Sequence, residues 1–303
     1  MKLPLTRDAL PLLRWVEETA STNALLREML EAASRGEDRL PHGALVVTAN
    51  QTAGRGRAGR GWETPPDTAI TASMLLRLDA AEIGAAASDE GAGQGAGQGA
   101  GGGLGLSWLP LLAGSAVAAA LQPLFRGDAP GESRRVGVKW PNDVHVRDEE
   151  QALAGVPGAK LCGILCEVLP GGYVIVGFGV NLLQEEWQLP TDRAGSVLVC
   201  GGRTMGAHTL ADARGEALAD RVLSSAAIEL LRLVELARDD PEAARRRVLR
   251  DSLTIGAEVR VHLPGGEIVD GRAVGLDESG ALIVDRPTSG RLIVSAADVE
   301  HLR

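Results

Sequence analysis

Cysteine and histidine are scarce in this chain of 303 residues, which contains three cysteines and five histidines. Three cysteines are too few for a disulfide framework, and Cys162 and Cys166 lie in an apolar stretch where small buried side chains are expected. The histidines are scattered and do not fall at the spacing of zinc ligands. These two shortages exclude a disulfide-stapled protein and a structural zinc domain.

A long uninterrupted apolar run is also missing. The N-terminus lacks the apolar core of a signal peptide, which predicts a cytoplasmic protein. The most apolar window, residues 109–125, is interrupted by Gly114 and Gln122 and is shorter than the ~20 residues that a membrane span needs. We therefore expect a buried core helix there and no membrane association.

Positive charge is in the minority. The net charge is −9, with 31 Lys and Arg against 40 Asp and Glu, and this balance argues against general binding to nucleic acid or to anionic membranes. Neither a Walker Gly-Lys-Ser/Thr motif nor a protein-kinase signature occurs in the chain. Any nucleotide that binds must therefore be held in another way.

What the chain does contain is a cationic, glycine-rich segment at residues 50–62, which we call the Arg-Gly loop. Three arginines and four glycines fill most of its second half, directly before Trp62. Glycine lets the backbone approach a ligand closely, and each guanidinium offers a planar set of donors that matches phosphate or carboxylate. The Arg-Gly loop therefore predicts a site for an anion.

Two alternatives for this loop carry less weight. Residues 54–59 fit the dinucleotide-binding pattern Gly-x-Gly-x-x-Gly, which requires a helix that opens inside the motif, and Pro65 and Pro66 forbid that helix. A solvated Arg-Gly linker that binds RNA loosely is the second alternative. It is disfavoured because the segment is short and lies between two apolar β-type runs, residues 44–48 and 69–76.

The pattern of the remaining chain predicts an α+β fold. One helix is capped by Ser21 or Thr22, a core helix spans residues 107–126, and two more helices follow at residues 209–237 and 241–250. The predicted strands of this part are residues 15–18, 44–48, 69–78, 136–144, 159–168 and 173–180. Alternation of helices and strands on this scale predicts a sheet flanked by helices.

Two other segments have distinct patterns. Residues 84–105 form a Gly/Ala/Gln/Ser tract that is too poor in apolar side chains to offset its ordering entropy, so we expect a disordered surface loop. The run at residues 245–247 consists of three arginines and predicts a solvated helix face. Toward the C-terminus, turn residues separate short predicted strands at 258–263, 268–276, 282–285 and 291–294, which indicates a β-barrel-like module of about 50 residues.

Polar side chains gather where the predicted strands end. Pro141 cannot donate to a sheet ladder, so its strand must end there or lie at an edge. Lys160 opens an apolar strand and is either a solvated end or a positioned cation. The groups at strand ends are the Arg-Gly loop, Lys139 with Asn142 and Asp143, Lys160, and Asn181. Clustered cations in an acidic protein predict a site for a polyphosphate and a second anion, and nucleotidyl transfer needs such cations more than a nucleophile.

Four motifs together give the chain a resemblance to the biotin protein ligase family, which covers nearly the whole chain from Trp15 onward. In the family's order and spacing, they are Ser21-Thr22-Asn23, Gly54-Arg55-Gly56-Arg57-x-Gly59-Arg60, Lys139-Trp140-Pro141-Asn142-Asp143 and Lys160-x-x-Gly163-Ile164-Leu165. The resemblance implies a ligase that attaches biotin to one lysine of a biotin carboxyl carrier domain of acetyl-CoA or propionyl-CoA carboxylase, through biotinyl-5′-AMP. It implies the type without an N-terminal DNA-binding domain, because the first motif begins too early to leave room for one.

The resemblance also implies residue roles. Lys160, Arg57 and Arg60 would be the catalytic residues, and Asp143 would hold Mg²⁺. The biotin-binding residues would be Ser21, Thr22, Asn23, Gln51, Gly54, Arg55, Gly56, Arg57 and Lys160. The ATP-binding residues would be Arg57, Arg60, Trp62, Lys139, Asn142 and Asn181.

The implied architecture is a class II synthetase-like catalytic domain at residues 1–251 and an SH3-like C-terminal barrel at residues 252–303. The chain departs from the family pattern in the tract at residues 84–105, taken as a tolerated insertion, and at Gly61 before Trp62. A monomer and a weak homodimer both fit the sequence. A lipoate-ligase-type enzyme shares the fold but is not expected to carry the Gly-Arg-Gly-Arg loop; it and the RNA-binding protein are the alternative functions.

Overall fold

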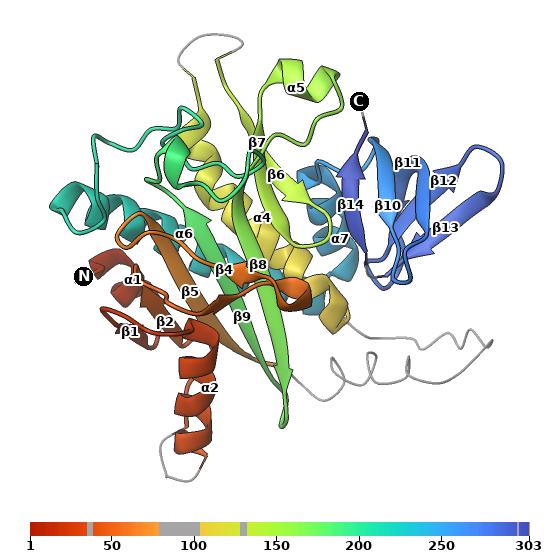
Figure 1. Cartoon of the computed structure of the whole chain (residues 1–303). Helices are drawn as coiled ribbons and strands as arrows, with labels where there is room; N and C mark the ends of the chain where they lie inside the picture. Colours follow the sequence, from red (N-terminus) through yellow and green to blue (C-terminus); the bar gives the residue numbers. More distant parts are fainter. Residues whose placement is uncertain (35–38, 79–103, 128–131, 296, 303) are drawn as a thin grey trace.

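A computed structural model of the chain describes residues 1–34, 39–78, 104–127, 132–295 and 297–302. Two sheets dominate it, a seven-stranded mixed sheet and a five-stranded antiparallel sheet (Figure 1). The large sheet has the order β1 (Leu13–Trp15), β2 (Leu45–Thr48), β5 (Ala69–Arg77), β9 (Tyr173–Asn181), β8 (Ala159–Leu169), β7 (Asp143–Arg147) and β6 (Arg135–Lys139). Only the β1–β2 pair is parallel among these neighbours. The mixed sheet of the predicted α+β fold is thus confirmed.

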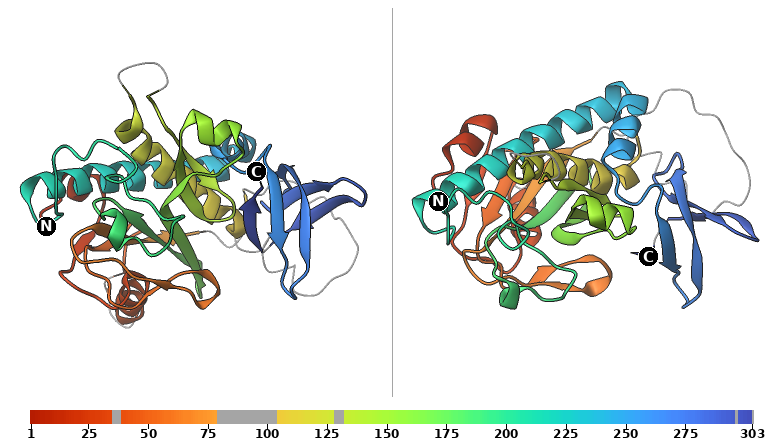
Figure 2. Two further views of the ribbon diagram at one scale, coloured as in Figure 1. Left: turned by 45° about the horizontal axis from the view of Figure 1, so that its top comes forward. Right: turned by 90° about the horizontal axis from the view of Figure 1, so that it is seen from above.

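Helices cover both faces of the large sheet. The helices are α1 (Pro4–Ala9), α2 (Thr22–Ala33), α4 (Leu109–Leu121), α5 (Glu149–Leu153), α6 (Ala213–Asp239) and α7 (Pro241–Asp251), with 3₁₀ turns η1 (Arg57–Gly59), η2 (Leu106–Trp108), η3 (Gln122–Phe125) and η4 (Glu186–Gln188). On one face α4 lies between the sheet and α6 (Figure 2). On the other face α2 packs against β2, β5 and β9.

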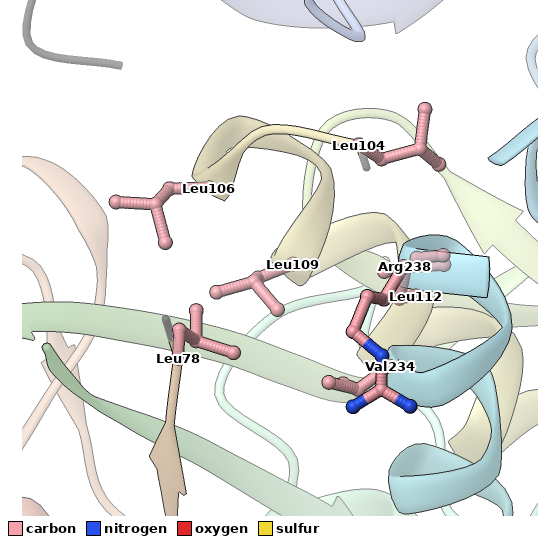
Figure 3. Close-up of a pocket in the computed structure, with 8 residues that line it drawn as sticks. Leu78, Leu104, Leu106, Leu109, Leu112, Val234 and Arg238 are labelled. Atoms are coloured by element: carbon pink, nitrogen blue, oxygen red, sulfur yellow. The ribbon is translucent and has the colours of Figure 1, made fainter. Parts of the chain in front are cut away.

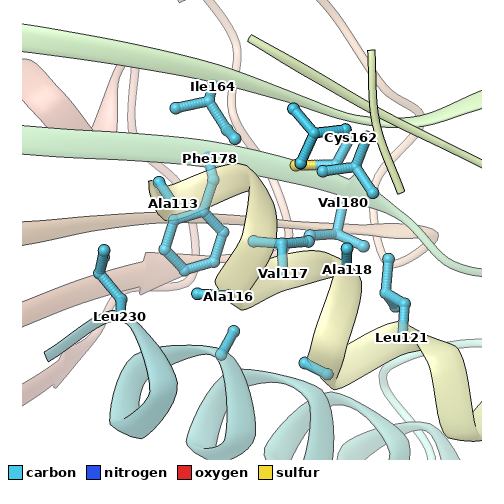
Figure 4. Packing of buried hydrophobic residues seen from close by; sticks show 14 of the residues in the cluster. Ala113, Ala116, Val117, Ala118, Leu121, Cys162, Ile164, Phe178, Val180 and Leu230 are labelled. Carbon is cyan, nitrogen blue, oxygen red and sulfur yellow. The ribbon is translucent and has the colours of Figure 1, made fainter. Parts of the chain in front are cut away.

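The two faces of the sheet bury different side chains. Val174 and Val176 of β9 join the main core under α4, whereas Ile175 between them joins a smaller cluster under α2. This follows from the alternation of side chains along a strand. Figure 4 shows the main core, where Ile164, Phe178 and Val180 point from the sheet toward α4. The part of the second face that α2 does not cover is therefore available for a binding site.

The segment Leu106–Phe125 is the core helix that its composition predicts. In the described part of the chain it is the one helical segment long and apolar enough to cross a membrane, and 78% of its most apolar window is buried inside the protein. A Cβ added at Gly114 would lie 3.0 Å from Val138 Cγ2, so glycine allows the helix to approach β6. The apolar surface of this segment is thus used by the fold itself.

A small hollow lies at the end of this helix (Figure 3). Its volume is about 20 Å³, enough for roughly one water molecule. Leucine side chains supply most of its lining, with Val234 and Arg238 from α6. A substrate cannot enter a hollow of this size, so it is a packing defect of the core.

The strand predicted at residues 136–144 is a hairpin. β6 ends at Lys139, a cis peptide bond joins Trp140 to Pro141, and β7 begins at Asp143. The chain therefore ends a strand at Pro141, as the missing N–H requires, and β6 is also the edge strand of the sheet. Between β7 and β8 lies the five-residue helix α5, which Asp148 caps through a reciprocal capping box with Gln151.

The five-stranded sheet is formed by the C-terminal part of the chain. Its order is β13 (Gly290–Val294), β12 (Leu282–Arg286), β11 (Ile268–Leu276), β10 (Glu258–His262) and β14 (Asp298–His301). Four of these strands were predicted and β14 was missed, because only Val299 and the preceding alanines mark it as apolar. Trp108 of η2 and Trp140, which follows β6, donate their indole N–H groups to the carbonyls of Glu278 (2.9 Å) and Gly280 (3.1 Å), which anchors the sheet.

Two further predictions meet different outcomes. The run at residues 245–247 is not a fully solvated face, because the Arg245 guanidinium lies 5.4 Å from the Trp108 ring centroid and Arg247 Nη1 lies 3.1 Å from Glu229 Oε1 of α6. Three like charges in sequence do not reveal that a neighbouring helix and ring supply partners. The Gly-rich tract predicted at residues 84–105 lies outside the described residues except for its last two.

Candidate functional site

A groove of about 1020 Å³ crosses the sheet face that α2 leaves open. This volume is at the upper end of the range for small-molecule sites. The predicted residues that line it are Ser21, Thr22, Asn23, Gln51, Arg55, Gly56, Arg57, Arg60, Trp62, Lys139, Asn142, Asp143, Lys160 and Asn181. Gly54 packs within the Arg-Gly loop instead, where an added Cβ would be 2.2 Å from the Trp62 carbonyl oxygen and 2.3 Å from Gln51 Nε2.

At one end of the groove, the N-terminus of α2 meets β5 through neutral side chains; we call this the acyl end. Ser21 caps α2 by accepting a hydrogen bond from the Ala24 N–H (3.4 Å). The Thr22 N–H donates to Gln51 Oε1 at 2.9 Å. Because Oε1 is thereby engaged, the Gln51 amide nitrogen faces Gly54 under the Arg-Gly loop. The N-terminus of α2, which Ser21 caps, is thus hydrogen-bonded to Gln51.

Ser73 of β5 completes the acyl end and was missed by the sequence reasoning. Its Oγ lies 2.6 Å from Asn23 Oδ1 and 2.7 Å from Thr22 Oγ1. An amide oxygen only accepts, so the single Ser73 proton goes to Asn23, and the threonine hydroxyl supplies the proton of the second contact. Asn23 Nδ2 donates to Glu167 Oε1 at 2.8 Å. The signal was a serine inside an otherwise apolar buried strand, where a hydroxyl needs a partner.

The opposite end, which we call the nucleotide end, is built around the Arg-Gly loop. The loop is a small hairpin of β3 (Gly54–Arg55) and β4 (Gly61–Trp62) joined by η1. Arg57 donates to Asn142 Oδ1 at 3.3 Å, and Arg60 forms an ion pair of 2.9 Å with Asp298 of β14. The Gly-x-Gly-x-x-Gly sequence contains a 3₁₀ turn and is followed by a strand, so the helix that a dinucleotide-binding motif requires does not form there.

Lys160 is a positioned cation, which decides between the two alternatives for the start of its strand. Its Nζ lies 2.8 Å from Asp143 Oδ1 and 5.7 Å from the Trp62 ring centroid. Asp143 is buried, which opposes ionisation, but hydrogen bonding to His145 and the charge of Lys160 outweigh that cost and lower the pKa of the carboxyl group. The Asp143 carboxyl group is therefore ionised at neutral pH.

His145 is a further residue that the sequence reasoning missed. Its ring lies behind Asp143, with Nε2 4.0 Å from Asp143 Oδ2 and Nδ1 3.1 Å from the Gly158 carbonyl oxygen. Burial lowers the pKa of the imidazole, and its contacts with Asp143 and with the Gly158 carbonyl group oppose that decrease. A lone histidine four residues after Pro141 gave no spacing signal.

Lys139 connects the nucleotide end to the C-terminal sheet. Its Nζ donates to the Val299 carbonyl oxygen of β14 at 2.6 Å. Burial lowers the pKa of this lysine, while the charge of Asp143 opposes the decrease and that of Lys160 adds to it. The C-terminal sheet thus supplies one wall of the groove, through residues 298–301.

Asn181 lines the groove but already has partners in the protein. Its Nδ2 donates to the Gly195 carbonyl oxygen at 2.9 Å, and its Oδ1 accepts from Gln184 Nε2 at 2.9 Å. One amide N–H and one lone pair remain for a ligand. Asn142 is similar, because its Nδ2 donates to the Ile164 carbonyl oxygen at 2.7 Å while its Oδ1 accepts from Arg57.

Asp143 has no carboxylate, cysteine or histidine cluster around it that could form a closed metal cage. Within the described residues, no group of three or more His, Cys, Asp or Glu side chains is arranged to hold a metal ion. Mg²⁺ in nucleotide sites is usually held by one or two carboxylates together with the phosphates of the substrate. A single carboxylate beside the cations therefore fits a metal that arrives with a nucleotide.

Comparison with known proteins gives the same picture. Residues 254–302 match the family model "Biotin protein ligase C terminal domain", and residues 17–89 match "Biotin/lipoate A/B protein ligase family". A biotin–[acetyl-CoA-carboxylase] ligase of Mycobacterium tuberculosis is 35% identical over 95% of this chain and 88% of its own length. The bifunctional ligase/repressor BirA of Escherichia coli is 28% identical, over 82% of this chain and 63% of that protein.

Solved structures agree on the fold. The biotin protein ligase of Aquifex aeolicus in complex with biotin and ATP has a TM-score of 0.64 and 23% identity, covering 97% of this chain and all of the other. Identity of 35% with one ligase over nearly the full length, together with the two family models, decides the relationship. The chain belongs to the biotin protein ligase family.

Proposed function

We propose that this protein catalyses the ATP-dependent attachment of biotin to a lysine of a carboxylase carrier domain. The observation that supports it best is the division of one groove into two ends, a neutral hydrogen-bonded end beside Thr22 and Ser73 and a cationic end beside Arg57 and Lys160. A pocket for a neutral ligand alone would lack the cationic end, and a pocket for a nucleotide alone would lack the neutral end. Biotin has a neutral ureido ring and an anionic carboxylate, so it fits such a groove with its carboxylate toward the cations.

In the first step of the proposed reaction, a carboxylate oxygen of biotin attacks the α-phosphorus of ATP and pyrophosphate leaves. Negative charge grows on the α-phosphoryl group, and Lys160, Arg57 and Arg60 stabilise it. Asp143 holds the Lys160 ammonium group at 2.8 Å and thereby restricts it to one place before substrate arrives.

In the second step, an uncharged lysine amine of the carrier domain attacks the acyl carbonyl of biotinyl-AMP, and AMP leaves. Water must be kept from the mixed anhydride until then, and the Arg-Gly loop, which lines the groove, would provide that cover. Trp62 would stack on the adenine ring. The carrier of acetyl-CoA carboxylase is the proposed acceptor, in keeping with the name of the mycobacterial relative.

The proposal includes Mg²⁺ at the nucleotide end. Asp143 would hold the ion together with the phosphates of ATP, and the ion would neutralise charge on the phosphoryl oxygens during departure of pyrophosphate. We also propose that residues 1–251 form the catalytic domain, of class II synthetase type, and that residues 252–303 form a separate SH3-like domain. The antiparallel order of its five strands supports the latter.

Pyrophosphate exchange into ATP tests the proposal directly. We expect exchange that depends on biotin, and a mass increase of one biotinyl group on a single lysine when a carrier domain is added. Lipoic acid and octanoic acid are the matched alternative acids, because one family model includes both ligase types. Exchange supported by lipoic acid and not by biotin would assign the lipoate-ligase activity, and exchange with no acid would contradict both.

A further inference from the structure

The end of β9 reads Gly177-Phe178-Gly179, and its two glycines face the groove. Phe178 between them points the other way, into the main core toward α4 (Figure 4). This alternation is that of any strand, but on the groove side it removes two side chains in succession. The absence of each side chain makes room for a different residue.

Gly179 makes room for Trp62. A Cβ added at Gly179 would lie 2.4 Å from Trp62 Cε2 and 2.5 Å from Trp62 Nε1. Gly163 of β8, the cross-strand partner of Gly179, contacts the other part of the indole, since its Cβ would lie 3.0 Å from Trp62 Cζ3. Two paired glycines thus form a flat seat on which the indole rests.

The indole is held on this seat by packing. Trp62 Nε1 is buried and has no hydrogen-bond partner among the described residues. A hydrogen bond would otherwise fix the orientation of the ring, so here the orientation depends on the surface beneath it. Because carbon atoms pack about 3.5–4.0 Å apart, a methyl group on Gly179 must displace the indole by roughly 1 Å or more.

Gly177 makes room for Asn23 instead. A Cβ added there would lie 2.3 Å from Asn23 Oδ1 and 3.0 Å from its Cγ. Asn23 cannot retreat freely, because Ser73 and Glu167 hold the two ends of its amide group. A methyl group on Gly177 therefore breaks at least one of these hydrogen bonds.

We propose that Gly177 and Gly179 are positioning residues that set the two ends of the groove separately. Gly177 places Asn23 for recognition of biotin, and Gly179, with Gly163, places Trp62 as a platform for the purine ring of ATP. The inference rests on the proposed function for the identity of the two ligands. Two nearby positions of one strand thus set the affinity for biotin and the affinity for ATP independently.

Alanine substitution at each glycine should weaken the apparent affinity for a different substrate. We expect Gly179→Ala to raise the KM for ATP in biotin-dependent pyrophosphate exchange by tenfold or more, with the KM for biotin within about twofold of wild type. Gly177→Ala should do the converse. Gly275→Ala is the matched control, because it also lies in a strand and its Cβ would meet only Ile283 Cδ1, at 4.0 Å; we expect both KM values to stay unchanged.

A double-mutant cycle tests whether Gly179 acts through Trp62. In a Trp62→Ala background, the further change Gly179→Ala should raise the KM for ATP less than twofold, because the displaced ring is gone. Tryptophan fluorescence is the second measurement: Gly179→Ala should change the emission of the ligand-free protein, and that change should disappear in the Trp62→Ala background. Should Gly179→Ala fail to fold, Gly163→Ala contacts the same ring at 3.0 Å. Because its Cβ also lies 3.4 Å from Lys160 Nζ, only the part of its effect that disappears in the Trp62→Ala background is assigned to the ring.

The outcomes separate this inference from the proposed function. A wild-type protein without biotin-dependent exchange contradicts the proposed function. An active wild type whose Gly177→Ala and Gly179→Ala variants raise both KM values alike contradicts the separate positioning. Effects of Trp62→Ala and Gly179→Ala that simply multiply contradict the action of Gly179 through Trp62.

Discussion

The two ends of the groove differ in how their side chains are held. At the acyl end, Thr22, Asn23 and Ser73 are buried and bonded to one another. At the nucleotide end, Arg60 and Asp298 pair across an exposed surface, with 61% and 64% of their side chains accessible. At the acyl end, folding has already oriented the dipoles that would recognise the neutral part of the ligand. At the nucleotide end, exposed cations stay paired with carboxylates of the protein until a polyphosphate binds.

The largest loss of activity should come from removing the charge of Lys160. Lys160→Ala should lower biotinyl-AMP formation by about 10²–10³-fold, because it removes a donor that faces the developing phosphoryl charge. The fold should survive, since the Lys160 side chain is partly exposed and adds little packing. Pyrophosphate exchange and the melting temperature are the measurements. Near-normal exchange in a folded variant would remove Lys160 from the mechanism.

Ser73→Ala should affect the acyl end alone. The Asn23 amide oxygen loses its donor, so biotin affinity should fall by roughly tenfold and the free energy of unfolding by about 1–3 kcal/mol, while the KM for ATP stays unchanged. Ser115→Ala is the matched control, because that buried hydroxyl has no hydrogen-bond partner in the described part of the chain. Calorimetric titration with biotin checks the result, and a shared loss of ATP affinity would erase the distinction between the two ends.

Acid should lower the free energy of unfolding through His301, which lines the groove. Burial lowers the pKa of His301 to about 3. The unfolded chain, with a histidine pKa of about 6.5, binds a proton first, so stability falls as the pH drops from about 6.5 toward about 3.

His301→Gln should therefore lose less stability than wild type between pH 7 and pH 4, as measured by urea unfolding. His208→Gln, at an exposed position, should follow the wild-type slope. Equal slopes for the His301 variant and the wild type would show that the ring stays solvated in the folded protein.

The smallest effect belongs to the exposed ion pair between the Arg-Gly loop and β14. Asp298→Asn should change the free energy of unfolding by less than about 0.5 kcal/mol, as is usual for exposed pairs. Amide exchange at residues 54–61 should nevertheless become faster, because the loop loses its contact with the C-terminal sheet. Unchanged exchange rates would show that η1 and the β3–β4 pairing hold the loop without help.

Much of the fold was predictable because its long elements have strong patterns. The core helix, the strands β5, β8 and β9, and the helices α6 and α7 agree with their predicted positions to within a few residues. Short elements failed: α5 has five residues with none buried, and β14 has four. Neither is long enough to show a period of its own, and both depend on the surrounding tertiary structure.

The site divides in the same way. The motif residues around Ser21, Arg57, Asp143 and Lys160 were visible because unusual residue types occur together in sequence. Ser73, Glu167 and His145 were not visible, because each is a single polar residue within a strand. The partners of Ser73 and Glu167 come from α2, at separations of up to 144 residues.

The amino-acid sequence by itself determined the charge and glycine content of the Arg-Gly loop, the burial of the core helix and the family to which the chain belongs, since these depend on residue types at local spacing. Only the tertiary structure decided which cation meets which carboxylate, that β14 supplies a wall of the groove, and that Gly177 and Gly179 support different side chains. The reason is that sheet register brings together residues from distant segments at ångström precision, and no local pattern encodes a distance between them.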